Sequence, residues 1–380
     1  ELPPSVLVSE LIDHIDQVFQ TTEGGVLRDH IVKKHRLQPF SHQYFSNTSQ
    51  LFSYSDEDCE TAKVMTDSRG KPAPFISRPI KVATVEQREI SLTELKRFFR
   101  NPAQYFLKHC LGIYLNEGRD ILEEQEPLHQ LNALEAYKLK DWLISKKMAG
   151  KDLQDYFALA RGEGVLPPAT PGIVAYNEIS EVVDAFAEEL SSYTDSEKLL
   201  PLDVDIPIDD FRITGRLENI WKSSLVEYRC VEKDRAKHHM DVWIDHVALN
   251  CAGNSKYPRK SIFARIGSSV SFNPLDDARS ELRKLLSYYL KGMTEPLIFF
   301  PETSAKYAER ITKIKSHEVA LQAARSDLEG SGFGRSEKDD PYYRICFGNI
   351  DPLDDTFALI AKDIFTPIIN SRSKNPRKKR

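Results

Sequence analysis

The strongest constraint on the fold is a change of pattern near residue 200. Before it, apolar residues recur every three to four positions, the spacing that lines one face of a helix. Helices are expected there over residues 4–19, 131–146 and 178–193. After it, short runs rich in β-branched and aromatic residues predict strands over residues 206–208, 212–221, 225–230, 261–266 and 296–300, with helices at 239–250 and 277–291. This order predicts an α/β core with an associated helical subdomain.

Length and composition exclude several classes of protein. The 380 residues are enough for a sizeable core and for two or three structural units. With 41% hydrophobic and 29% charged residues, the chain is neither disordered throughout nor a disulfide-stapled miniprotein. No run of 18 apolar residues occurs, so no membrane span is expected. The formal net charge of −5 argues against a protein that simply coats DNA, but it leaves room for a local basic groove.

The N-terminus and the cysteines suggest whether the chain is part of a longer polypeptide and which cellular compartment suits it. Glu1 is not a start methionine and no signal-peptide pattern follows, so we expect a piece of a longer polypeptide. The five cysteines are far apart and form no C-x-x-C pair. We expect buried free thiols in a reducing cytosol, rather than disulfides or a zinc site.

Two segments lack a clear helical or strand pattern. Residues 21–87 are dominated by Ser, Asp, Pro and short aromatic clusters, which predicts an extended connector that packs by its aromatic side chains. Within it, Asp56, Glu57 and Asp58 are expected to lie in solvent rather than to bind a metal. The basic residues between Arg372 and Arg380 predict a tail that binds nucleic acid or an acidic partner, or is simply solvated.

The sequence between these two segments predicts two helix starts. Ser91 is followed three residues later by Glu94, the spacing of a capping box, in which each side chain bonds the backbone amide of the other residue. Asn101 is a good N-cap and Pro102 a good first helical residue, so a second helix is expected to run to about Gly112.

The residues most suggestive of chemistry are Glu218, Glu227 and Arg229. Glu227 and Arg229 are two positions apart and therefore share one face of a strand. A hairpin with the preceding strand would bring Glu218 near that face. Two carboxylates and a cation in this order resemble the D…(D/E)-x-K pattern of metal-dependent nucleases, in which a divalent ion makes hydroxide and stabilises the attacked phosphate.

Two departures count against an active nuclease. Arg229 stands where the pattern has lysine, and arginine stays protonated, so it cannot join a proton relay. Glu218 is longer than the usual aspartate and would displace a metal that needs near-ideal geometry. A cross-strand charge network on a half-exposed ribbon explains the same residues, and we favour this or a dead site over active chemistry.

A second polar group follows on the predicted helix at 239–250. Its members are His238, His239, Asp241, Asp245 and His246. No H-E-x-x-H motif occurs, and His239 and His246 are seven positions apart, so they do not form a close helical pair of metal ligands. Surface and packing histidines are expected, with Trp243 on the core side of the helix.

Six stretches spread over most of the chain carry a further pattern: residues 4–11, 35–41, 51–55, 91–106, 242–246 and 291–297. The fourth contains Arg-Phe-Phe-Arg-Asn-Pro at 97–102, and the fifth is Val-Trp-Ile-Asp-His. In this order they resemble the C-terminal part of the RecC family, the gamma subunits of exodeoxyribonuclease V.

The resemblance implies a fold and a function. RecC subunits work with RecB and RecD to unwind and degrade double-stranded DNA ends in recombinational repair, in the bacterial cytoplasm. It implies a PD-(D/E)xK restriction-endonuclease-like core without activity, with Glu218, Glu227 and Arg229 as its degenerate positions. Such a domain splits the duplex, guides the separated strands and helps to hold RecD. Active relatives carry Q-x-x-x-Y on the next helix, where this chain has His239 and Trp243.

The resemblance also implies what the chain lacks. No metal, cofactor or iron–sulfur cluster is expected in it, because no cysteine lies at the Asn101-Pro102 turn and the complex uses ATP and Mg²⁺ in other subunits. No Walker A motif occurs, so no ATP hydrolysis is expected. The implied domains are the end of a helicase-like domain at 1–45, a connector at 46–90, a nuclease-like domain at 91–365 with a helical part at 91–195 and an α/β core at 196–365, and a basic tail at 366–380.

Local basic clusters beside aromatic residues or glycine loops are then candidate phosphate contacts. They are Lys96, Arg100, Arg235, Lys237, Lys256 and Arg259. Each can instead be a solvated surface cation. Three hypotheses remain: a non-catalytic DNA-guiding and assembly domain, an active nuclease using Glu218 and Glu227, and a module that only docks other proteins.

Overall fold

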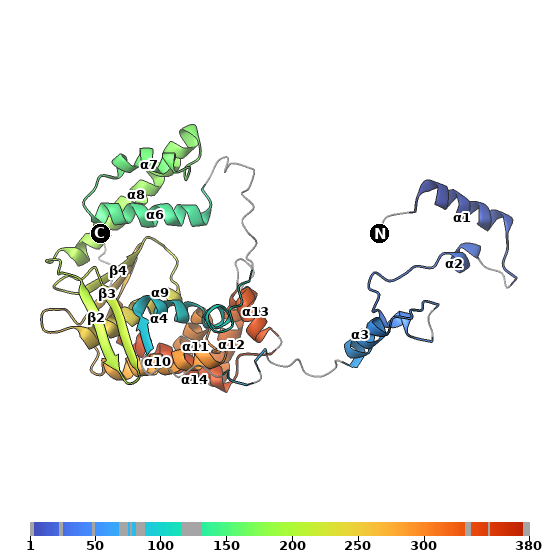
Figure 1. The fold of residues 1–380 in the computed structure, drawn as a ribbon. Coiled ribbons are helices and arrows are strands. Elements are labelled where there is room, and N and C mark those ends of the chain that lie inside the picture. The colour runs from blue at the N-terminus through green and yellow to red at the C-terminus, as the bar shows by residue number, and fades with distance from the viewer. Residues whose placement is uncertain are drawn as a thin grey trace. The chain divides into compact units, whose positions relative to one another are not determined.

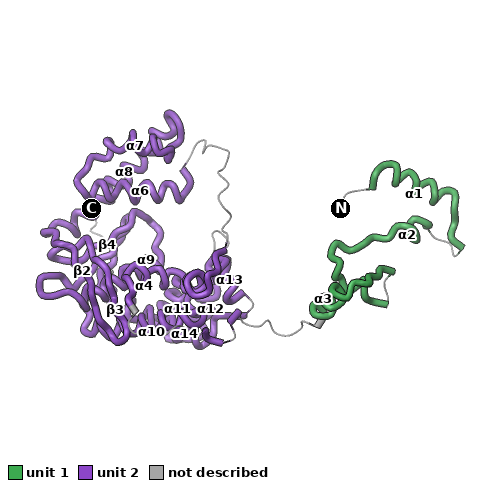
Figure 2. The backbone as a smooth tube through the Cα atoms, viewed as in Figure 1, with its two compact units in different colours: residues 1–72 green, residues 73–380 purple. Residues whose placement is uncertain are grey.

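The computed structural model describes residues 4–22, 26–47, 50–67, 75–76, 78–80, 88–115, 131–330, 336–348 and 350–374. It divides the chain into two compact units, Glu1–Pro72 and Ala73–Arg380 (Figure 2). The described residues form a mixed α/β structure that is mostly helical and contains two small mixed sheets. The α/β prediction is confirmed at this level. No helix in the described ranges is long and apolar enough to cross a membrane.

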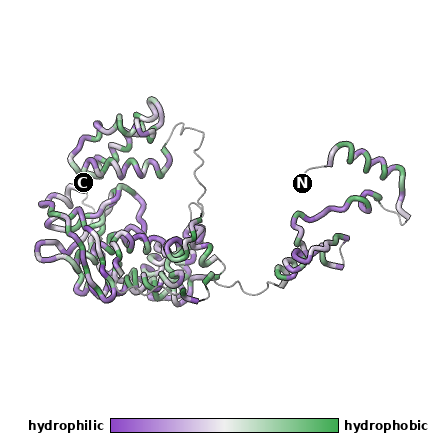
Figure 3. Tube along the Cα trace, in the orientation of Figure 1, coloured by the Kyte–Doolittle hydropathy of each residue, from purple (hydrophilic) through white to green (hydrophobic). Residues whose placement is uncertain are grey.

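The first unit is built from short helices: α1 (Val6–Val18), α2 (Leu27–Ile31), the 3₁₀ turn η1 (His42–Tyr44) and α3 (Asp56–Asp67). Helix α1 confirms the helix expected at 4–19, and the two hydropathy colours alternate along it in Figure 3. Helix α3 lies in the stretch predicted to be an extended connector, which is wrong for these residues. Asp56, Glu57 and Asp58 occupy its first turn, where the helix dipole favours negative charge.

The second unit holds both sheets. The first has the order β1-β3-β2, with β1 (Arg88–Ser91) parallel to β3 (Phe211–Leu217) and β2 (Leu202–Ile208) antiparallel to it. The second has the order β4-β5-β6-β7, formed by β4 (Leu225–Arg229), β5 (Ser261–Arg265), β6 (Ser268–Phe272) and β7 (Arg372–Lys374). Strand β4 is parallel to β5, and the remaining pairs are antiparallel.

Helices surround these sheets (Figure 1). Those before the strands are α4 (Leu92–Arg100), α5 (Pro102–Tyr105), the π-helical turn η2 (Phe106–Cys110), α6 (Ala133–Met148), the 3₁₀ turn η3 (Leu153–Tyr156), α7 (Phe157–Gly162) and α8 (Ala169–Thr194). Those that follow β4 are α9 (Ala236–Ala252), α10 (Ala278–Thr294), α11 (Pro301–Ile314), α12 (His317–Glu329), the 3₁₀ turn η4 (Glu337–Asp339), α13 (Pro341–Phe347) and α14 (Asp355–Ser371). Figure 1 shows α6, α7 and α8 grouped together, apart from the layer that contains α10, α11 and α14.

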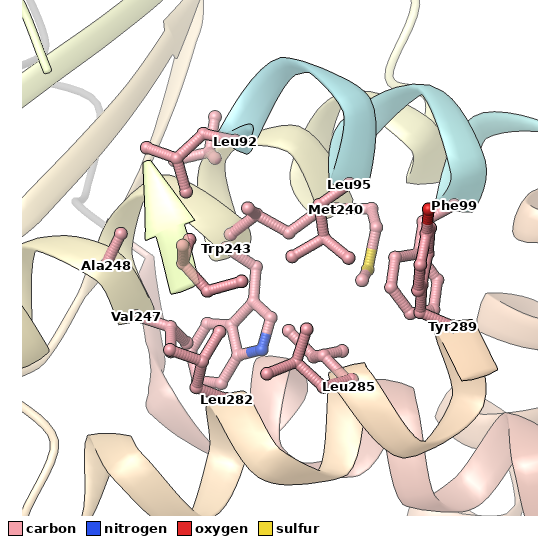
Figure 4. Close-up of a cluster of buried hydrophobic side chains, with 14 of the residues drawn as sticks. Leu92, Leu95, Phe99, Met240, Trp243, Val247, Ala248, Leu282, Leu285 and Tyr289 are labelled. Atoms are coloured by element: carbon pink, nitrogen blue, oxygen red, sulfur yellow. The ribbon is translucent and has the colours of Figure 1, made fainter. Parts of the chain in front are cut away.

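The core is centred on α9. Trp243 is fully buried between α4 and α10, where Leu95, Leu282 and Leu285 enclose it (Figure 4). Its predicted place on the core side of the helix is confirmed. Burying a large apolar side chain of this kind stabilises the fold by a few kcal/mol, on the order of 2–3. Helix α9 is therefore fixed against α4, and polar residues on its other positions are held in place with it.

The side-chain caps predicted at both helix starts are confirmed. The Ser91 hydroxyl accepts a hydrogen bond from the Glu94 amide at 3.1 Å, and the Asn101 side chain accepts one from the Gln104 amide at 2.9 Å. The Glu94 carboxylate does not complete the predicted box. It accepts instead from the Tyr105 hydroxyl at 2.5 Å, which ties α4 to α5.

Other expectations differ from the structure. The strand predicted at 296–300 is wrong: this buried segment is irregular, with Phe299 N donating to Leu297 O at 2.8 Å. Strand β6, which was not predicted, pairs with β5. Of the tail predicted at 366–380, residues 366–371 belong to α14 and 372–374 to β7, and residues 375–380 lie outside the described ranges. All five cysteines carry free thiols.

Candidate functional site: a buried charge network beside a basic cleft

Glu218 lies outside any cluster that the structure forms around Glu227. Strands β3 and β4 belong to different sheets. A short antiparallel turn links them, with a bridge between Ile220 and Leu225 and a hydrogen bond from Val226 N to the Asn219 carbonyl at 3.0 Å, but the ladder does not extend to Glu218 among the described pairings. Glu218 follows the end of β3, and Asn219 turns the chain with a φ of 55°. Its side chain is 69% exposed, and its carboxylate pairs with Arg216 at 3.9 Å.

Glu227 and Arg229 share one face of β4, as predicted, and that face meets two helices. Helix α9 contributes Asp241 and Asp245, one turn apart, and α4 contributes Lys96 and Arg100, also one turn apart. We call these six residues the charge network: Lys96, Arg100, Glu227, Arg229, Asp241 and Asp245.

The network is joined by ion pairs between distant parts of the sequence. Lys96 Nζ donates to Asp245 Oδ2 at 2.6 Å. Arg100 donates from Nε to Asp241 Oδ1 at 2.9 Å and from Nη2 to Oδ2 at 2.7 Å. Arg229 donates from Nη2 to the same Oδ2 at 3.2 Å and from Nη1 to the Tyr137 hydroxyl at 3.1 Å.

Because the carboxylates are buried, these ion pairs matter for the stability of the fold. The Asp245 and Asp241 side chains are only 4% and 7% exposed. Carboxylates removed from water in this way are stable only when paired, and removal of one partner costs about 3–5 kcal/mol. Burial also raises the pKa of Glu227, and the neighbouring Asp245 carboxylate raises it further against the opposing charges of Lys96 and Arg229. Burial raises the pKa of Asp245 as well, although Lys96 opposes it.

These residues do not fit a divalent metal. In the described part of the chain, no group of three His, Cys, Asp or Glu side chains is placed to hold a metal ion. Asp241 and Asp245 are paired with Lys96, Arg100 and Arg229, while Glu218 lies in solvent. The arrangement is that of a self-neutralised charge cluster, and no metal-dependent step follows from it.

A cleft of about 990 Å³ opens beside the network. Its walls come from the α4–α5 junction, α6, the segment after β4, the start of α11, η4 and α13. The cationic side chains that line it are Arg100, Arg229, Lys233, Arg235 and Lys237. The acidic ones are Glu302, Glu337, Asp339 and Asp340. We call this feature the basic cleft.

The acidic residues of the cleft are committed to helix ends. Glu302 accepts from the Ala236 amide at the start of α9 at 2.9 Å. Glu337 accepts from two amides at the start of α11, those of Glu302 at 3.1 Å and Thr303 at 2.8 Å. Asp340 caps α13, and Asp339 accepts from Ser336. Backbone N–H groups at the helix ends partly offset these charges.

Three cations of the cleft lie near carboxylates: the Glu302 charge acts on Arg235 and Lys237, and the Asp327 charge acts on Arg235 and Lys233. Among the described residues, Lys233, Arg235 and Lys237 form no ion pair within 4.0 Å. His238 lines the same cleft, and burial with the nearby Arg229 charge lowers its pKa to about 3, so it is neutral at pH 7. Lys233, Arg235 and Lys237 are therefore the cations of the cleft that no ion pair among the described residues holds.

The six predicted phosphate contacts separate into three places. Lys96 and Arg100 belong to the charge network, and Arg235 and Lys237 line the cleft together with Lys233, which was not predicted. Lys256 and Arg259 lie in the loop after α9. Arg259 is bonded there to the Asn250 side chain at 3.2 Å and to the Leu275 carbonyl, whereas Lys256 is exposed.

Two histidines of α9, His239 and His246, are buried and hydrogen-bonded. His239 is buried, and its Nε2 lies 2.6 Å from Asp234 Oδ1. His246 is fully buried, with Nδ1 2.8 Å from the Ser261 hydroxyl and Nε2 3.0 Å from the Asn273 carbonyl. Asp241 and Asp245 were not predicted as site residues. The available signal was two helices with like charges one turn apart, basic on α4 and acidic on α9.

Comparison with known proteins identifies the family. Residues 87–312, more than half of the chain, match the RecC C-terminal domain family. RecBCD enzyme subunit RecC of Buchnera aphidicola subsp. Schizaphis graminum is 24% identical over 398 residues, covering 97% of this chain and 35% of that protein. The same subunit of Escherichia coli K12 is 24% identical over 369 residues, covering 92% and 32%, and that of Haemophilus influenzae is 25% identical over 363 residues, covering 90% and 29%. The chain thus spans about a third of the length of these relatives. It belongs to the RecC C-terminal domain family.

Proposed function

We propose that this chain is the non-catalytic C-terminal part of a RecC subunit in a RecBCD complex. It acts in recombinational repair of double-strand breaks by guiding and splitting duplex DNA ends and by docking RecB and RecD. The observation that carries the proposal is the charge network. Asp241 and Asp245, the buried carboxylates beside Glu227, are each paired with a cation of the chain itself.

A degenerate PD-(D/E)xK core is part of this proposal. It is supported by β4, which carries Glu227 and Arg229 on one face, and by α9, whose Asp241 accepts a hydrogen bond from Arg229 of that strand. The core is degenerate because Glu218 turns to solvent and arginine occupies the position of the motif's lysine. A chain of this kind contributes no chemistry and depends on partner subunits for ATP and for metal-dependent cleavage.

DNA guidance is supported by the basic cleft. A strand of DNA presents one phosphate per nucleotide, and uncommitted cations in a groove bind it mainly by releasing its condensed counterions. Lys233, Arg235 and Lys237 supply such cations, and Tyr137 places an aromatic ring in the same cleft. Cations combined with an aromatic surface are the usual features of a path for a single strand.

The test is to incubate the 380-residue chain with linear duplex and single-stranded DNA, with Mg²⁺ or Mn²⁺ present. We expect no digestion and weak binding whose affinity falls steeply with salt. Digestion that disappears in Glu227→Ala and Glu218→Ala variants would establish the active nuclease and overturn the proposal. Absence of any DNA affinity at low salt would leave the module that only docks other proteins.

A further inference from the structure

Helix α11 carries a row of cations that leads away from the basic cleft. Lys306, Arg310 and Lys313 follow one another at intervals of four and three residues, so they lie within about 60° of one another around the helix axis. We call these three residues the cation row. Arg310 and Lys313 are exposed, and Lys306 is partly exposed. The other side of α11 is covered by α12 and α14, against which Tyr307 is buried (Figure 1).

The cation row begins at the cleft. Glu302, in the first turn of α11, lines the cleft together with Arg235 and Lys237. Its carboxylate accepts a hydrogen bond at 2.9 Å from the amide of Ala236, the residue between those two cations. Lys306 is four residues further along α11 than Glu302, about 6 Å along the axis. The cations of the cleft and those of α11 therefore follow one another on a continuous surface.

The cation row is not neutralised by the chain itself. Among the described residues, none of its members forms an ion pair within 4.0 Å or a side-chain hydrogen bond. Two carboxylates lie near it. Glu309 is paired with Arg372 at 3.9 Å. Burial raises the pKa of Asp327 on α12, and the charge of Lys306 opposes that rise. With one of the two carboxylates paired elsewhere, the row of three cations remains positive.

We infer that the cation row extends the DNA path out of the basic cleft and binds the phosphates of the single strand that leaves it. This rests on the proposed DNA guidance. A single strand presents one row of phosphates, and α11 offers a cation about every 5 Å along its axis. From Glu302 to Lys313 the helix adds about 16 Å to the path. Tyr307, the one aromatic residue of α11, is buried, so bases find nothing to stack on and binding there is independent of sequence.

The experiment compares the 380-residue chain with the double variant Arg310→Ala/Lys313→Ala. Fluorescence anisotropy at several salt concentrations measures the binding of labelled oligothymidylates of about 4 and about 16 nucleotides. For the longer strand, the loss of two phosphate contacts should reduce the slope of log affinity against log salt by about 1.4, at about 0.7 per phosphate of a single strand. The shorter strand, which the cleft alone can hold, should bind the double variant and the wild-type chain alike.

The matched control is Lys151→Ala/Arg161→Ala. It also removes one exposed lysine and one exposed arginine, and neither forms an ion pair among the described residues. Both lie with α6, α7 and α8, which Figure 1 shows apart from α11. The control should leave the salt slope of both strands unchanged. Alanine at exposed positions of a helix favours the helix, so Arg310→Ala/Lys313→Ala should keep the circular dichroism of the wild-type chain.

Several outcomes would overturn the inference. If the longer strand binds Arg310→Ala/Lys313→Ala with the wild-type slope, or if both double variants lower the slope equally, the cation row is no part of the path, while the proposed DNA guidance stands. If the wild-type chain binds neither strand at low salt, the DNA guidance fails and the inference fails with it. Binding of polyglutamate in place of DNA, lost in Arg310→Ala/Lys313→Ala, would assign the row to an acidic protein partner and so contradict the inference.

Discussion

Arg100 and Asp241 form a two-point ion pair across 141 residues of sequence, from Nε to Oδ1 at 2.9 Å and from Nη2 to Oδ2 at 2.7 Å. Arg229 donates a further hydrogen bond to the same carboxylate. One aspartate thus joins α4, β4 and α9. Because two parallel N–H···O bonds fix the direction of a guanidinium group as well as its distance, the pair orients Arg100 at the edge of the basic cleft.

Loss of the Asp241 charge should destabilise the fold strongly. Asp241→Asn leaves two guanidinium groups without their counter-charge. Because Arg100 is 47% exposed and solvent screens it, the expected cost is about 1.5–3 kcal/mol, the range for hydrogen bonds to charged groups. Urea unfolding followed by circular dichroism measures the change. The control is Asp205→Ala, which breaks an exposed pair with Arg212 at 2.7 Å and should leave the free energy of unfolding nearly unchanged. Equal losses in the two variants would show that burial does not set the strength of the Asp241 ion pairs.

Charge removal in the cleft should weaken DNA binding more than charge removal at the other end of α9. If Arg235 and Lys237 each bind one phosphate, Arg235→Ala or Lys237→Ala should reduce the slope of log affinity against log salt by about one. Lys256→Ala is the matched control, since the 17 residues of α9 place it about 25 Å from the cleft. Fluorescence anisotropy with a labelled single strand at several salt concentrations gives the slopes. A larger effect of Lys256→Ala would indicate that the DNA path runs along the loop after α9 and not through the cleft.

Local features of the fold could be predicted from the sequence because their causes are local. The caps at Ser91 and Asn101 depend on a few neighbouring residues, and the shared face of Glu227 and Arg229 follows from the two-residue period of a strand. Trp243 was placed correctly because a large apolar residue on a periodic helix rarely faces water.

The charge network could not be predicted, because its ion pairs are set by tertiary packing. Lys96 and Asp245 are 149 residues apart, and either could have faced solvent on its own helix. The prediction that Glu218 lies near Glu227 is wrong for a different reason. It requires the alternation of a strand to continue through residue 218, but β3 ends at Leu217 and Asn219 adopts a left-handed conformation, which breaks the two-residue period.

Acid should weaken the fold through His246. Burial lowers the pKa of this histidine to about 4, below its ordinary value near 6.5. Between these values only the unfolded chain takes up the proton. The stability that neutral His246 contributes is therefore fully present above pH 6.5 and is lost as the pH falls towards 4. The expected loss is about 2 kcal/mol between pH 7 and pH 5. Urea unfolding at pH 7 and pH 5 measures the loss of unfolding free energy in the wild-type chain and in His246→Gln. The loss should be smaller in His246→Gln by about this amount, and an equal loss in both chains would assign the acid sensitivity to other groups.

A methyl group at Gly292 should destabilise the core by overpacking it. Gly292 lies in α10, and a Cβ atom there would come within 2.3 Å of Cζ of Phe98 and 2.5 Å of its Cε2. Phe98 is fully buried and packs edge-to-face on Tyr105 and Tyr289, so it has no free space to move into. Replacing glycine by alanine inside a helix normally gains about 1 kcal/mol, but forced overpacking costs about 1–3, so Gly292→Ala should lower the thermal midpoint. Gly162→Ala is the control, because no atom lies within 4 Å of its Cβ position, and it should leave the midpoint unchanged or raise it. A midpoint raised equally in both variants would mean that Phe98 yields to the new methyl group at no cost.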